Sequence, residues 1–344
     1  PEQDAMISCI MKACAEAGAA PRLGSYHAEI RTAEGRVLRF ESAWMEERIE
    51  SKNELKRALY RALTELTGKA LPWVTLTGIR PAKLALTRLQ EGKSADEVRA
   101  EFKRDFFLSD ARNELCVRTA ENELRAIRGL DFSTGYSLYI GIPFCPTTCL
   151  YCSFPSYPIG SKKSTVYLTA LKEEIRLVAE LMAEKRLDAI YVGGGTPTSL
   201  SAAELEDLLG FVRWLFDLSA LREFTVEAGR PDSISREKLI VLKEQGADRI
   251  SINPQTLKQE TLDLIGRFHT VDQFTESFRL ARELGFYNIN TDLIMGLPNE
   301  SEADVRRTME GIRALSPDDV TIHSLALKRA ARLNTKREDY ADVS

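Results

Sequence analysis

The chain has 344 residues, of which 44% are hydrophobic and 28% charged, the balance of an ordinary soluble globular protein. Its net charge of -4 argues mildly against a nucleic-acid or anionic-membrane partner, because both need clustered lysine and arginine. No apolar run approaches the roughly 18 residues of a membrane span, and the first residues are polar rather than signal-like. We therefore expect a cytoplasmic protein without a membrane or nucleic-acid partner.

The length predicts two or three domains. The sequence changes character near residue 130, and we expect a mostly helical accessory domain over residues 1–132 and an α/β core over 133–330. The chain begins at Pro1 rather than Met and stops in a charged stretch, so we expect a fragment of a longer protein, with residues 331–344 opening a further region.

The first 130 residues predict one hairpin and several helices. The hairpin joins Tyr26–Arg31 and Val37–Glu41 around a turn that ends in glycine. Apolar residues then recur at helical spacing over residues 55–66, and Ser94–Glu97 reads as a capping box that opens another helix. A further long helix is predicted over Ser109–Ile127.

From residue 137 onward, short apolar runs alternate with amphipathic segments of helical length. Six strand-then-helix units in a row favour a parallel sheet with helices outside it, as an open doubly wound sheet or as a barrel short of the usual eight units. The predicted strands cover 138–144, 189–193, 223–228, 249–253, 288–295 and 319–325, and the predicted helices lie near 164–185, 201–217, 235–245, 256–265, 271–284 and 301–314.

Unusual residues follow these strands. Cys145 comes after the first strand, Gly193–Gly195 after the second, Glu227 at the end of the third, and Gln255 after the fourth, while Asp292 lies in the fifth. In either architecture the ligand site lies beyond the carboxyl ends of the strands, so these residues are predicted to converge there.

Three of the six cysteines fall within eight residues, in Cys145-Pro-Thr-Thr-Cys149-Leu-Tyr-Cys152. Thiolates at this spacing in a loop can wrap one soft metal centre. A structural zinc site normally has four ligands, and no fourth Cys or His is near, whereas a four-iron cluster on three cysteines leaves one iron open. Zinc, or burial of the cysteines as small hydrophobes, is the alternative.

A glycine triplet, in Val192-Gly-Gly-Gly-Thr196-Pro, follows the second strand. By itself it is typical of a tight turn that needs positive φ. At the carboxyl end of a strand it also lets the backbone approach a ligand.

Together these segments resemble the radical SAM superfamily, whose motif is CxxxCxΦC with an aromatic residue before the last cysteine; here that residue is Tyr151. The form of the glycine motif and the order of the segments resemble the oxygen-independent coproporphyrinogen III oxidase family. That resemblance covers residues 136–327. It is carried by Tyr139–Cys145, Gly193–Thr198, Thr225–Ala228, Arg249–Gln255, Gly266-Arg267 and Asp292–Pro298.

The resemblance implies a partial (β/α)6 TIM-like barrel preceded by a smaller, mostly helical α+β domain. It also implies a [4Fe-4S] cluster on Cys145, Cys149 and Cys152, with S-adenosylmethionine (SAM) on the open iron and a 5′-deoxyadenosyl radical as its product. The positions that match SAM-contacting residues are Tyr139, Gly194, Gly195, Thr196, Glu227, Gln255, Arg267 and Asp292.

Two segments, Leu76–Pro81 and Glu227–Asp232, resemble the HemZ subgroup, named as a coproporphyrinogen dehydrogenase. This implies oxidative decarboxylation of coproporphyrinogen III to protoporphyrinogen IX in haem biosynthesis, with a reductant such as flavodoxin or ferredoxin. The well-studied oxidases carry a further cysteine where this chain has Phe154. The haem chaperones called HemW also lack it, and Leu264–His269 is similar to their GRxH segment; against that reading, about 130 residues precede the cysteine motif here. A chaperone without oxidase activity, or another radical SAM reaction on a tetrapyrrole, stays the alternative.

The other noted residues give less. Leu76–Pro81 fits a recognition loop or the start of a helix equally well, and Trp73 before it is expected to pack. We expect ordinary burial for the remaining cysteines, Cys9, Cys14 and Cys116. His27 and His269 are expected to be structural. Nothing in the sequence fixes the role of His323, on the sixth predicted strand.

Overall fold

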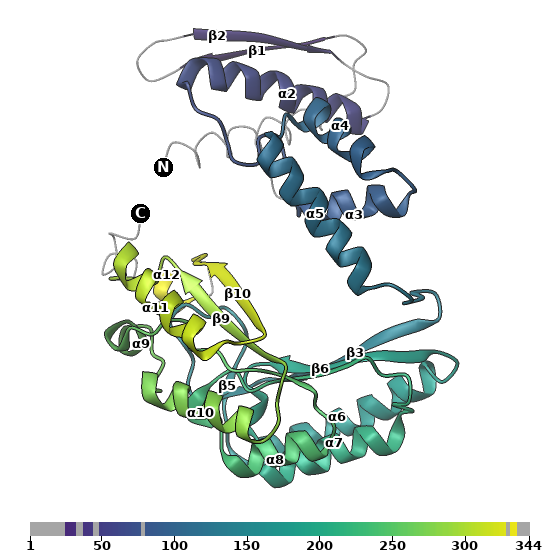
Figure 1. The fold of residues 1–344 in the computed structure, drawn as a ribbon, viewed down its shortest axis with the longest axis vertical. Coiled ribbons are helices and arrows are strands. Elements are labelled where there is room, and N and C mark those ends of the chain that lie inside the picture. The colour runs from purple at the N-terminus through teal and green to yellow at the C-terminus, as the bar shows by residue number, and fades with distance from the viewer. Residues whose placement is uncertain (1–24, 32–36, 44–47, 77–79, 328–330, 336–344) are drawn as a thin grey trace. The chain divides into compact units, whose positions relative to one another are not determined.

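In the computed structural model, the described residues are 25–31, 37–43, 48–76, 80–327 and 331–335 (Figure 1). The chain forms two compact units, Pro1–Gly129 and Leu130–Ser344. None of the described helices combines the length and the apolar composition that crossing a membrane requires.

The first unit pairs a hairpin with helices. The predicted hairpin is confirmed as an antiparallel pair, while its turn lies outside the described residues. The elements are β1 (Ser25–Arg31), β2 (Val37–Ala43), α2 (Arg48–Thr67), α3 (Pro81–Gln90), α4 (Ala95–Phe106) and α5 (Asp110–Ala126).

Helix starts in this unit follow from their capping residues. Ser94 accepts from the backbone N–H of Glu97, and the Glu97 side chain accepts from that of Ser94, so the predicted capping box opens α4. Pro81 is the first residue of α3, where its missing N–H needs no partner, so Leu76–Pro81 leads into a helix; residues 77–79 lie outside the described residues.

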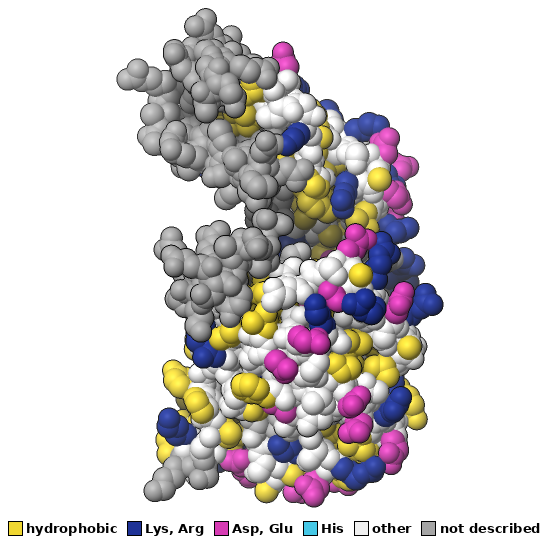
Figure 2. Space-filling view, turned by 90° about the vertical axis from the view of Figure 1, so that its left-hand side faces the viewer, with side chains coloured by type: hydrophobic (Ala, Val, Ile, Leu, Met, Phe, Trp, Pro, Cys, Tyr) yellow, Lys and Arg dark blue, Asp and Glu magenta, His cyan; other side chains and the backbone are white. Residues whose placement is uncertain are grey.

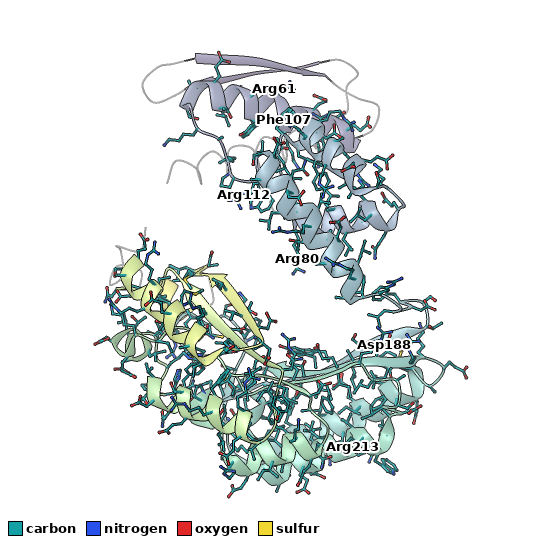
Figure 3. All side chains as sticks on the ribbon, in the orientation of Figure 1. Arg61, Arg80, Phe107, Arg112, Asp188 and Arg213 are labelled. Carbon is teal, nitrogen blue, oxygen red and sulfur yellow. The ribbon has the colours of Figure 1, made fainter. Side chains whose placement is uncertain are left out.

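Aromatic rings of the first unit carry arginines on their faces. The Arg61 guanidinium lies 4.8 Å from the ring centroid of Phe107, and that of Arg112 lies 5.3 Å from Trp73 (Figure 3). Trp73 is half-buried against the core of the unit, which confirms its expected packing role.

The second unit is a six-stranded parallel sheet in the spatial order β10-β9-β8-β7-β6-β3, which is also the chain order. A doubly wound sheet reverses this order at a switch point, and no reversal occurs here. Because right-handed crossovers in one direction place their helices on one face, the sheet curls into a partial barrel. Figure 1 shows α6, α7 and α8 along the same side of it.

All six predicted strands and all six predicted helices are present, and two of the helices, α9 and α10, follow β8. The strands are β3 (Gly135–Ile142), β6 (Arg186–Gly194), β7 (Glu223–Glu227), β8 (Arg249–Ser251), β9 (Ile289–Met295) and β10 (Asp319–Ser324). The helices are α6 (Ser161–Leu181), α7 (Ala202–Leu215), α8 (Arg236–Glu244), α9 (Gln259–Leu264), α10 (Val271–Glu283) and α11 (Glu302–Leu315), with α12 (Arg332–Thr335) after β10.

Short elements that periodicity did not predict lie in the loops at the carboxyl ends of the strands. A two-residue parallel pair joins β4 (Phe144–Cys145) to β5 (Tyr157–Pro158) across the cysteine motif. The 3-10 turns η1 (Pro197–Ser199) and η2 (Pro231–Ser233) follow β6 and β7. Each is too short to show a hydrophobic period of its own.

The core of this unit lies between the sheet and its helices, and residues such as Ile190, Val192, Phe224 and Leu209 are fully buried there. Burying one such side chain contributes about 1.5–3 kcal/mol. On the face that Figure 2 shows, lysine and arginine side chains lie among acidic ones rather than in one single-sign patch.

Candidate SAM and cluster site

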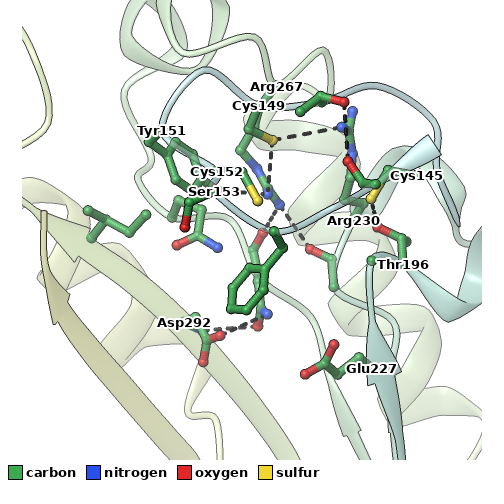
Figure 4. Close-up of a pocket in the computed structure, with 18 of the residues that line it drawn as sticks. Cys145, Cys149, Tyr151, Cys152, Ser153, Thr196, Glu227, Arg230, Arg267 and Asp292 are labelled. Carbon is green, nitrogen blue, oxygen red and sulfur yellow. Dashed lines mark hydrogen bonds between the residues drawn. The ribbon is translucent and has the colours of Figure 1, made fainter. Parts of the chain in front are cut away.

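One pocket of about 390 Å³ opens at the carboxyl ends of the barrel strands (Figure 4). Every site residue predicted from the sequence lines it, although these residues are spread over some 150 positions of the chain. They are Tyr139, Cys145, Cys149, Cys152, Gly194, Gly195, Thr196, Glu227, Gln255, Arg267 and Asp292.

The cysteine loop, residues 145–152, is fixed by backbone hydrogen bonds from two other parts of the unit. The Leu150 N–H donates to the carbonyl of Ile265 at 2.9 Å. From the other side, the Leu333 N–H of α12 donates to the Leu150 carbonyl at 2.8 Å, and Arg332 donates to the Thr148 carbonyl. Hydrogen bonds therefore tie the cysteine loop to Ile265 and to α12.

The three thiols have different neighbours. Thr196 donates its hydroxyl to the Cys145 sulfur at 3.4 Å. The Cys149 sulfur lies 3.9 Å from Arg230 Nη1 and 4.0 Å from Arg267 Nη1. Burial raises the pKa of the Cys152 thiol. Two guanidiniums therefore lie beside Cys149, whereas a neutral hydroxyl lies beside Cys145.

The surroundings of Arg267 indicate whether the pocket suits an anionic group. It is only 3% exposed, its Nε has no hydrogen-bond partner, and within the described part of the chain it forms no salt bridge. Its other nitrogens donate to the carbonyls of Gly229 and Asn253 and to the Tyr151 hydroxyl. A buried guanidinium without a carboxylate is costly unless an anion binds beside it.

The three cysteines therefore fit a thiolate-bound cluster, and Arg267 fits a carboxylate group bound next to that cluster. Among the described residues, no group of three or more His, Cys, Asp or Glu is arranged around a single ion. In a four-iron cluster each cysteine binds a different iron, so a cluster does not need its three cysteines to surround a single ion.

The glycine triplet lies against the cysteine loop. Gly194 has φ +110°, which favours glycine. A Cβ added to Gly195 would lie 2.7 Å from the carbonyl oxygen of Phe144 and 3.1 Å from the Cys145 sulfur. Glycine is thus required both by the turn and by the close approach of the backbone to the pocket.

Glu227 is oriented by a residue that the sequence argument missed. The Tyr191 hydroxyl donates to Glu227 Oε1, and the Tyr191 ring stacks on Tyr139 at 5.9 Å between centroids. Burial raises the pKa of Glu227, and the nearby Asp292 charge raises it further, while the Tyr191 hydrogen bond opposes both. The signal was present in β6, because period-two alternation puts Tyr191 on the same face as Gly193.

Two asparagines orient Asp292, and neither was predicted. Asn253 Nδ2 donates to Oδ2 at 3.0 Å, and Asn290 Nδ2 donates to Oδ1 at 2.7 Å. Gln255 stands beside them with φ +70°, and its buried side-chain oxygen has no partner among the residues that the structure describes. These amides hold the carboxylate rigid, and the free Gln255 oxygen is an acceptor available to a ligand.

The remaining noted residues divide between site and core. His323 lines the pocket, and Phe154, 66% exposed, lies at its rim. His269 is fully buried outside the pocket lining, as expected of a structural residue. Cys116 is buried as predicted, and burial raises the pKa of its thiol to about 11. Cys9 and Cys14, and the side chain of His27, lie outside what the structure describes.

Comparison with known proteins identifies similar sequences. The family described as the Radical SAM superfamily matches residues 139–312. The chain is 41% identical over 295 residues to the oxygen-independent coproporphyrinogen-III oxidase-like protein HemZ of Bacillus subtilis, a match that covers 84% of this chain and 59% of that protein.

Two other curated relatives match shorter stretches of the chain, of 193 and 191 residues. The heme chaperone HemW of Bacillus subtilis is 40% identical over 193 residues, covering 56% of this chain and 51% of its own. The oxygen-independent coproporphyrinogen III oxidase of Escherichia coli (strain K12) is 32% identical over 191 residues, covering 55% and 42%. The chain thus spans 42–59% of the length of these relatives.

Among solved structures, coproporphyrinogen III oxidase (HemN) from Escherichia coli matches with a TM-score of 0.53 and 26% identity. The match covers 65% of this chain and 56% of that one.

Proposed function

Because the chain belongs to the radical SAM superfamily, we propose that it is an oxidoreductase that decarboxylates propionate side chains of a tetrapyrrole, converting coproporphyrinogen III to protoporphyrinogen IX. The cofactors of this superfamily are a [4Fe-4S] cluster and SAM, as the cysteine motif implied. When bound, they supply a 5′-deoxyadenosyl radical that abstracts hydrogen.

The residues of this chain bind and orient. In the proposal, Cys145, Cys149 and Cys152 hold the cluster as thiolates. Arg267 offers its unpartnered Nε–H to the SAM carboxylate. The Gly194–Thr196 backbone accepts from the SAM ammonium.

The far side of the pocket would hold the rest of SAM. Glu227, Asp292 and Gln255 accept from ribose and adenine donors, with the two carboxylates already held by Tyr191 and by the asparagines. Tyr139, within β3, stacks on Tyr191 and also lines the pocket. No protein base is needed at the β-carbon: each turnover removes one hydrogen atom from it, releases carbon dioxide and one electron to an acceptor, and leaves a vinyl group.

The observation that supports this substrate is the reach of the HemZ match. It extends over 295 residues and so includes much of the first unit as well as the barrel, whereas the HemW match spans 193 residues. A cytoplasmic location and a flavodoxin or ferredoxin as reductant belong to the same proposal.

The test is a product analysis of the anaerobically reconstituted protein with SAM, a low-potential reductant and coproporphyrinogen III. We expect 5′-deoxyadenosine, carbon dioxide and a vinyl-bearing porphyrinogen, and no products from a Cys149→Ala variant. SAM cleavage without a vinyl product would refute the substrate assignment and leave the radical chemistry standing.

A haem chaperone is the second candidate, and the barrel supports it. The chain is 40% identical to the HemW protein over 193 residues but 32% identical to the Escherichia coli oxidase over 191, and Phe154 stands where the oxidases carry a further cysteine. Stoichiometric haem binding without porphyrinogen turnover would favour this candidate.

A further inference from the structure

A second buried arginine reaches the cysteine loop, and the site residues predicted from the sequence do not include it. Arg230 lies between β7 and η2 and is 3% exposed. Its guanidinium donates to both carboxylate oxygens of Asp232, from Nε at 2.9 Å and from Nη2 at 2.6 Å. This bidentate pair fixes the plane of the guanidinium.

The remaining nitrogen of Arg230 contacts the loop. Nη1 donates to the Thr147 carbonyl at 2.9 Å and to the Thr147 hydroxyl at 2.7 Å, and it lies 3.9 Å from the Cys149 sulfur. Arg267 approaches the same sulfur from its own side of the loop. Cys149 thus has two guanidinium neighbours, whereas Cys145 has a neutral hydroxyl.

The charges at Cys149 do not cancel. Arg230 pairs with one carboxylate, that of Asp232, whose side chain is 19% exposed, and among the described residues Arg267 forms no salt bridge, which leaves an excess positive charge beside the sulfur. Buried charges act strongly because little water screens them. A four-iron cluster on three thiolates is anionic and becomes more so when reduced, and hydrogen bonds and positive charge at its sulfurs raise its reduction potential.

We propose that Arg230 is a positioning residue that holds the cysteine loop through Thr147 and raises the reduction potential of the cluster through Cys149. The inference rests on the proposed cluster site and not on the tetrapyrrole substrate. It gives the Glu227–Asp232 segment a physical role that the sequence pattern alone did not supply.

The test compares reduction potentials, measured by a redox titration of the cluster's paramagnetic signal in reconstituted protein. Arg230→Gln removes the positive charge and leaves a polar but shorter side chain. We expect its ratio of reduced to oxidised cluster at fixed poise to fall about tenfold, which is about 59 mV for one electron. The matched control is Arg236→Gln, because exposed Arg236 pairs with Glu283 away from the loop; its potential should equal that of wild type.

A second variant reverses the sign. Asp232→Asn removes the carboxylate but leaves both guanidiniums, so the potential should rise. This variant decides the matter if Arg230→Gln fails to take up a cluster: an unchanged or lowered potential in Asp232→Asn would overturn the role of Arg230.

Iron and sulfide analysis distinguishes a failure of the role of Arg230 from a failure of the cluster site itself. If loaded Arg230→Gln has the wild-type potential, the role of Arg230 falls while the cluster site stands. If wild-type protein takes up no iron and sulfide, the cluster site falls, and this inference with it.

Discussion

Cys116 and Cys149 are both buried cysteines, one in each compact unit, and their surroundings differ in charge. Cys116 lies on α5 among apolar side chains, and burial raises the pKa of its thiol to about 11. Cys149 lies beside two guanidiniums and a backbone loop fixed on both sides. The two thiols therefore differ in their neighbours: apolar side chains surround Cys116, and positively charged groups lie beside Cys149.

The same contrast extends to other buried polar groups. In the first unit, Glu101 is paired with Arg88 and Lys93, so its charge is compensated within the unit. Among the described residues, unpartnered buried side-chain atoms occur in both units, and those of Arg267 and Gln255 belong to residues that line the pocket of the second unit. Unpaired buried groups that converge on a cavity indicate a ligand that supplies the missing partner.

The largest expected effect comes from replacing Cys149 and Cys116 with alanine, one at a time. Cys149→Ala should remove the cluster and abolish SAM cleavage, because a three-thiolate site loses one ligand. Cys116→Ala should keep full iron and activity and lower the free energy of unfolding by about 1 kcal/mol. Iron and sulfide per chain and 5′-deoxyadenosine formation are the measurements, and equal losses in both variants would contradict the comparison.

Next in size is a cavity in the first unit. Phe102 is fully buried on α4, and Phe102→Ala should lower the free energy of unfolding of this unit by about 3–5 kcal/mol. Because Phe102 belongs to a core separate from that of the barrel, cluster content should not change. Denaturant unfolding together with iron analysis checks this, and loss of iron from Phe102→Ala would show that the units depend on each other.

His269 gives a pH-dependent effect in the barrel. Burial and the nearby Arg267 charge lower the pKa of His269 to about 3. On acidification the unfolded chain therefore takes up a proton on this residue near pH 6.5, whereas the folded chain does not. Stability due to this group is therefore present above pH 6.5 and is lost as pH falls toward 3. Between pH 7.5 and 5.5 the wild-type apoprotein should lose about 1 kcal/mol more than His269→Gln. Urea unfolding at both pH values measures this, and parallel losses would contradict it.

The smallest effect concerns Tyr191. Tyr191→Phe removes the hydroxyl that orients Glu227, and it should weaken SAM binding to cluster-loaded protein by about 1 kcal/mol, or roughly fivefold. Equilibrium dialysis measures this. Exposed Tyr287 offers the control, because Tyr287→Phe should bind as wild type does. Unchanged SAM binding by Tyr191→Phe would show that the Tyr191 hydroxyl does not contribute to the site.

The sequence by itself determined the order of the barrel and the surest residues of the site. Periodicity and capping boxes are local signals, so Ser201 and Ser301 marked the starts of α7 and α11, and the six strands followed in order. The cysteine spacing is local too. Parallel strands bring their carboxyl ends to one edge, which is why Glu227 and Asp292 could be assigned to one pocket before it was seen.

Only the tertiary structure decided which neighbours those residues have. Arg230 meets Thr147 across 83 positions, Tyr191 meets Glu227 across 36, and Leu333 meets Leu150 from the far end of the chain. Such contacts depend on side-chain direction and loop path, which no local period encodes. For the same reason, the spacing of the motif marked Cys149 in the sequence, but only the fold placed Arg230 and Arg267 beside its sulfur.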